Sequence, residues 1–148
     1  MQEDRRSFFE QLRDVPLVTS PEIVGQWAAI AYQREPWRSM PLDDLLGELP
    51  SVASALLREV PRGDGQEPTL LELCARCHGS FRRRQGVAAP ALSQESNMLA
   101  ETLRVVLQRH GVSDAMAADV VLLIGRDLRL VRRAMSAGYL DGPSCPRR

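Results

Sequence analysis

The chain of 148 residues contains no lysine, few aromatic side chains and no long apolar run. Nineteen arginines balance nineteen acidic residues, so the formal net charge is zero, and no global field attracts nucleic acid or anionic lipid. No stretch approaches the roughly 18 apolar residues that a membrane-spanning helix needs. The N-terminal stretch is charged and lacks the apolar centre of a secretory signal. These absences predict a cytoplasmic protein that binds neither nucleic acid nor membrane.

Strand signals are also scarce, because aromatic residues make up only 5% of the chain and no segment alternates regularly between apolar and polar residues. Apolar residues recur instead at helical spacing. We expect an all-α single domain, a helical bundle or globin-like packing, at 20–140, with a helix and lead-in at 1–19 and a tail or linker at 141–148. The expected helices lie at about 3–15, 20–35, 42–49, 51–60, 69–85, 93–110 and 113–140.

Several helix ends are marked by capping residues. Ser20-Pro21 places a capping residue before a proline at the first helical position, and Ser113 offers a second N-cap. Gly86 and Gly111 stand where glycines end helices. In the last helix a core-facing stripe has three-and-four spacing, with arginines on the opposite face. The stripe is Ala117, Val120, Ile124, Leu128, Val131 and Met135, and the arginines are Arg126, Arg129 and Arg133.

The run Cys74-Ala75-Arg76-Cys77-His78 has the spelling of a covalent haem attachment site, in which two thiols bind the haem vinyl groups and the histidine binds iron. Helical spacing suggests another interpretation, since Leu70, Cys74, Cys77 and Phe81 fall on one apolar stripe. Buried free cysteine acts as a small hydrophobic residue. We therefore expect no cofactor, with covalent haem c at Cys74, Cys77 and His78 as the alternative.

Cysteine number bears on the compartment and on metal binding. Three cysteines, an odd number, argue against a disulfide framework and favour a reducing compartment. Cys74, Cys77, His78 and Cys145 are four formal zinc ligands, but a structural zinc site usually presents its second ligand pair as a compact unit. Cys145 stands alone in a proline-flanked tail, so no metal is predicted.

The residues after the cysteines carry two further signals. Glycine inside a helix costs about 1 kcal/mol relative to alanine, so Gly79 predicts a close helix crossing beside His78. Arg82, Arg83 and Arg84 form a local basic cluster, which we interpret as a solvated face.

The order of motifs resembles the N-terminal sensory domain of RsbR-type stressosome co-antagonists and related sensor kinases. The resemblance covers about 21–140, including a Trp before a Leu-Pro break upstream. The residues that carry it are His78-Gly79, Arg82, Gln85-Gly86 and Glu95. It implies a globin-like domain without haem, a homodimer, and a possible ligand or signalling surface at His78, Gly79, Arg82, Gln85 and Glu95. The sequence ends without a STAS, kinase or DNA-binding segment, so a downstream regulatory protein or an output domain beyond the C-terminus is expected.

Three function classes remain. The first is a non-enzymatic bacterial signal-input domain acting by rearrangement of dimer helices or by partner binding. The second is a c-type haem redox or gas sensor. The third, an enzyme, is not predicted, because the sequence shows no Ser-His-Asp ordering, no phosphate loop and no paired metal-binding carboxylates on one face.

Overall fold

The computed structural model describes residues 19–58, 70–123 and 125–141. Within these ranges the chain is all-α and forms one helical bundle, with seven α-helices, one short 3-10 helix and no strand. The elements, in chain order, are α2 (Ser20–Ala31), η1 (Trp37–Ser39), α3 (Leu42–Leu46), α4 (Leu49–Arg58), α5 (Leu70–Arg84), α6 (Ala89–Arg109), α7 (Asp114–Leu123) and α8 (Gly125–Asp141). The predicted helix at 3–15, the ends of the chain and Cys145 lie outside the described residues.

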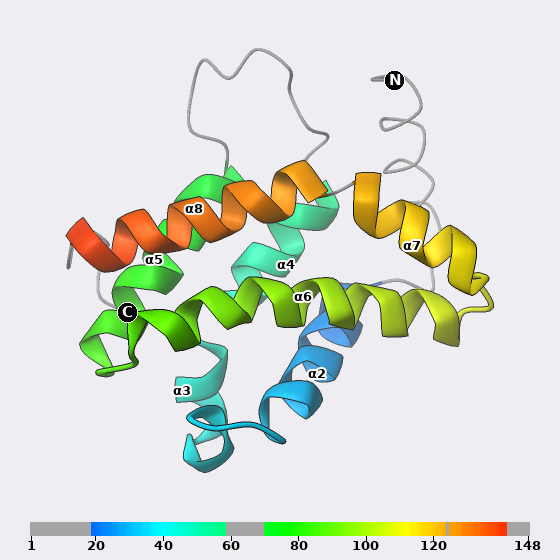
Figure 1. Ribbon diagram of the computed structural model, residues 1–148. Coiled ribbons are helices and arrows are strands. Elements are labelled where there is room, and N and C mark those ends of the chain that lie inside the picture. Colours follow the sequence, from blue (N-terminus) through cyan, green and yellow to red (C-terminus); the bar gives the residue numbers. More distant parts are fainter. Residues whose placement is uncertain (1–18, 59–69, 124, 142–148) are drawn as a thin grey trace.

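The longest helix, α6, lies in the middle of the bundle. It contacts α2 on one side and α8 on the other, and α7 packs near its C-terminal end (Figure 1). The main apolar core fills the space between these helices and includes Trp27, Leu45, Met98 and Val131, all at most 1% exposed. A smaller cluster of Leu107, Ala117 and Val120 lies under α7. No helix of the described part is long and apolar enough to cross a membrane.

Local sequence signals place some helix ends correctly, whereas α2 ends at Ala31 and not at 35, and α6 begins at Ala89 and not at 93. Gly86 and Gly111 have φ values of 79° and 85°, the left-handed conformation expected of glycines that end helices. The Ser113 hydroxyl accepts a hydrogen bond from the Met116 N–H at the start of α7. At α2 the cap is Thr19 and not Ser20, because the Thr19 hydroxyl accepts from the Glu22 N–H. The Ser20 hydroxyl instead bonds that of Ser54 on α4.

Of the expected helix at 113–140, the structure describes two parts, α7 at Asp114–Leu123 and α8 at Gly125–Asp141, while Ile124 between them lies outside the described residues. The predicted stripe is buried on both helices at Ala117, Val120, Leu128, Val131 and Met135. The opposing arginines Arg126, Arg129 and Arg133 are exposed. Periodicity therefore predicted the buried face correctly on both helices.

Helices α5 and α8 cross with their backbones in contact. An added Cβ at Gly79 would lie 2.7 Å from the carbonyl carbon of Met135 and closer still to its oxygen. The reverse holds at Gly138, where a Cβ would lie 2.7 Å from the carbonyl carbon of Arg76. The two glycines thus make a reciprocal crossing in which neither position has room for a side chain. This confirms the close crossing predicted at Gly79.

Candidate functional site

The buried face of α5 differs by one residue from the predicted stripe. The buried positions are Leu71, Ala75, His78 and Arg82, together with Gly79 and Ser80. Leu70 is 50% exposed, and Cys74, Cys77 and Phe81 are only partly buried. The expected core stripe through the cysteines is therefore wrong. The prediction placed the buried face one residue away because two of the buried positions hold polar side chains, which a search for apolar residues does not select.

The centre of the site is a buried ion pair between α5 and α6. Arg82 is 0% and Glu95 1% exposed. The Arg82 Nε donates to Glu95 Oε2 over 2.8 Å, and Nη2 donates to Glu95 Oε1 over 3.0 Å. Such bidentate, charge-assisted pairs are among the strongest side-chain hydrogen bonds. The expectation that Arg82 belongs to a solvated basic cluster is wrong, whereas its neighbours Arg83 and Arg84 are exposed.

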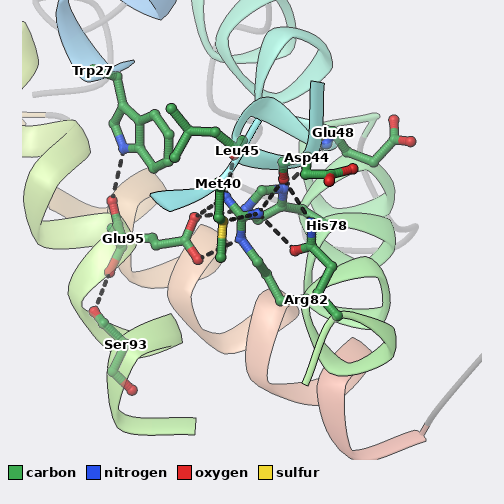
Figure 2. Close-up of polar contacts among 11 residues, drawn as sticks. Trp27, Met40, Asp44, Leu45, Glu48, His78, Arg82, Ser93 and Glu95 are labelled. Carbon is green, nitrogen blue, oxygen red and sulfur yellow. Dashed lines mark hydrogen bonds and ion pairs between the residues drawn. The ribbon is translucent and has the colours of Figure 1, made fainter. Parts of the chain in front are cut away.

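All five N–H donors of Arg82 are used inside the protein (Figure 2). Besides the bonds to Glu95, Nη1 donates to the Asp44 carbonyl and to Gln85 Oε1, over 2.7 and 2.8 Å. Nη2 also donates to the Leu45 carbonyl. These carbonyls belong to the last residues of α3, and the last carbonyl groups of a helix have no hydrogen-bond partner within it. Arg82 therefore caps the C-terminal end of α3 while neutralising Glu95.

His78 performs the matching task for α4. The Glu48 backbone N–H, immediately before α4, donates to His78 Nδ1 over 3.2 Å. The other ring nitrogen, Nε2, lies 2.9 Å from Glu95 Oε1 and is hydrogen-bonded to it. The imidazole is 0% exposed, and the bonds at both ring nitrogens fix its orientation. We call His78, Arg82, Gln85 and Glu95 the polar cluster.

The electrostatics of the polar cluster favour an ionised Glu95. Burial by itself raises the pKa of this carboxyl, but attraction and hydrogen bonds from His78 and Arg82 outweigh burial and hold the pKa below its usual value of 4.5. On α6 the backbone of Glu95 is fixed as well, because its carbonyl accepts from Trp27 Nε1 over 3.4 Å. The cluster therefore links α2, α5, α6 and the turn between α3 and α4.

One buried polar atom lies outside this pattern. Among the described side chains, the indole Nε1 of Trp37 is the one buried nitrogen or oxygen that lacks a hydrogen-bond partner. An unsatisfied buried donor of this kind costs about 1–3 kcal/mol. Trp37 is 0% exposed and belongs to η1, which precedes α3. The segment that contains η1 and α3 therefore includes a buried group that lowers the stability of the folded protein.

The residues do not fit covalent haem. Cys77 is disulfide-bonded, a bond that the argument from the odd number of cysteines did not predict. Cys74 retains its thiol and is half-buried. Both ring nitrogens of His78 are engaged, one with Glu48 and one with Glu95, which leaves none to bind iron. Within the described ranges, no three potential ligands from His, Cys, Asp and Glu gather closely enough to hold a metal ion.

The structure thus brings together the residues that carry the family resemblance. His78, Arg82, Gln85 and Glu95 are hydrogen-bonded to one another, and Gly79 lies at the crossing with α8. They form an interior cluster, in which Gln85 is only partly buried. Sequence reasoning missed the backbone partners at 44–48 and the second crossing glycine, Gly138. A glycine in the middle of an apolar helix, the signal used for Gly79, was present at Gly138 as well.

The chain matches no protein-family model, no curated protein and no solved structure.

Proposed function

We propose that the chain is a non-enzymatic bacterial signal-input domain of the RsbR-type stressosome co-antagonist class, with a globin-like fold. It acts in the cytoplasm as a homodimer, without membrane or nucleic acid, and passes its signal to a downstream regulatory protein or an attached output domain. In this proposal the signal changes helix packing between two arrangements of similar free energy. The resemblance in the sequence provides the class, and the polar cluster provides the physical support.

The observation that carries the proposal is the sealed ion pair between Arg82 and Glu95. A buried ion pair is weak evidence for stability, since well-packed apolar residues often stabilise a core equally well or better. Here its bonds extend across three helices and the α3–α4 turn, so a change at any one element alters the others. Side chains so sealed are poorly placed for catalysis but well placed to couple helix positions.

Light scattering on the purified full chain during size exclusion tests the proposed dimer. We expect a dimer at micromolar concentration and, after mixing with STAS-domain regulators encoded by the same genome, a larger complex. A monomer at all concentrations that binds none of them would contradict the proposal. STAS-domain regulators from an unrelated genome serve as the control for non-specific association.

An absorption spectrum separates this proposal from the haem alternative. We expect no Soret band, because His78 is fully engaged by protein groups. A Soret band that survives acid-acetone extraction would establish covalent haem and replace the proposed function with a haem sensor.

A further inference from the structure

The segment 36–48 is attached to the bundle in an unusual way. It contains only η1, of three residues, and α3, of five residues, and helices this short are not stable on their own. The N-terminal part of the segment is held by Tyr32, whose hydroxyl donates to the Met40 carbonyl over 3.3 Å. We call this segment the strap.

On the side of the strap that faces α5, hydrogen bonds come from three side chains at or near the C-terminal end of that helix. Arg82 donates to the carbonyls of Asp44 and Leu45, and Gln85 Nε2 donates to the Asp44 carbonyl over 2.7 Å. His78 accepts from the Glu48 N–H. Side chains of α5 therefore hold the strap at 44–48, and the Val52 N–H of α4 bonds the carbonyl of its last residue, Glu48, over 3.0 Å.

The strap also contains one feature that opposes its closed position, at Trp37, and one that allows close packing, at Gly47. Trp37 keeps a buried N–H without a partner, which solvent would satisfy once the strap lifted. Gly47 has a φ of 51° and lies so close to the bundle that an added Cβ would be 2.8 Å from the Phe81 ring and 3.1 Å from His78 Nδ1. Against the unpartnered Trp37 N–H stand the buried side chains of Trp37 and Leu45 and the three latching side chains.

We propose that the strap opens locally while α5, α6 and α8 stay folded, with Arg82 and Gln85 as its latch. Opening removes the carbonyl partners of two Arg82 donors, so it also controls whether the guanidinium can meet a group from outside the chain. Such partial openings involve contiguous units held by fewer interactions than the core. The inference holds whether or not the proposed signalling role is right.

Hydrogen exchange measured by mass spectrometry on the full chain tests this directly. The reporting amides are those of Leu45, Gly47 and Glu48, each bonded in the closed strap. In the wild-type protein we expect them to exchange at least about tenfold faster than amides inside α6 and with a smaller urea dependence. Equal rates with equal urea dependence would overturn the proposal, because the strap would then open only when the whole protein unfolds.

The latch is tested with Gln85→Ala, which leaves the Arg82–Glu95 charges intact. Loss of the bonds to Asp44 and Arg82 should speed exchange of the strap amides about three- to tenfold and leave α6 amides unchanged. Gln108→Ala is the matched control, since it removes a side-chain hydrogen bond of the same type to Asp114 at the far end of α6. A uniform acceleration by Gln85→Ala, or an equal strap effect from Gln108→Ala, would contradict the latch.

Fluorescence gives a second measurement that does not depend on exchange chemistry. The chain has two tryptophans, so Trp27→Phe leaves Trp37 as the single indole. We expect acrylamide to quench Trp37 more strongly when Gln85→Ala is added to that background. Unchanged quenching, together with unchanged exchange, would show that Gln85 does not hold the strap closed.

Discussion

Helix α5 is held in two chemically different ways. Against α8 it makes direct backbone contact at Gly79 and Gly138, and against α3 and α4 it reaches out with Arg82, Gln85 and His78. The first contact depends on the absence of side chains, whereas the second depends on charge and hydrogen bonding. We therefore expect steric changes to break the crossing, and changes of charge or pH to break the polar cluster.

The largest expected effect comes from Arg82→Met, which leaves Glu95 as a buried charge without its cation. Removing one partner of a buried ion pair destabilises proteins by about 3–5 kcal/mol, measured as the free energy of unfolding in urea. Arg34→Met is the matched control, because the Arg34–Glu101 pair is exposed and such pairs contribute at most about 1 kcal/mol. If both variants lost a similar free energy of unfolding, the buried Arg82–Glu95 pair would contribute no more to stability than an exposed pair does.

Gly138→Ala should destabilise the crossing by about 3 kcal/mol, at the upper end of the range for overpacking. The added methyl would meet backbone atoms of Arg76, which cannot move aside as a side chain can. Gly25→Ala is the control: this glycine lies in α2 with nothing near its missing Cβ, so the substitution should stabilise by up to about 1 kcal/mol. Thermal unfolding measures both, and a neutral Gly138→Ala would disprove the tight crossing.

Acid should weaken the cluster and leave the crossing intact. The folded pKa of Glu95 lies below its usual value of 4.5, so its contribution to stability is complete above pH 4.5 and is lost as the pH falls through the lower, folded value. Urea unfolding between pH 6 and 3 measures this loss. Glu95→Gln should have a shallower acid dependence than wild type, while the exposed Glu101→Gln should keep the wild-type slope. Identical slopes in all three proteins would contradict a coupled Glu95.

Helix α8 was predictable because its buried face is apolar, and counting apolar residues at helical spacing selects the correct side. On α5 the same procedure selected Leu70 and the cysteines, since His78 and Arg82 do not register as core residues. The burial of Arg82 depends on Glu95, thirteen positions away, and on backbone carbonyls of α3. No local pattern contains these partners, although the motif order did group His78, Arg82, Gln85 and Glu95 as one set.

The reciprocal glycines also limit how α5 and α8 can move. Sliding along their length would bring ordinary side chains into the space that Gly79 and Gly138 leave open. The two helices also contact each other along much of their length, and Arg83 bonds the carbonyls of Tyr139 and Leu140 near the end of α8. Their register is therefore fixed, and a displacement of α5 would carry α8 with it as one body.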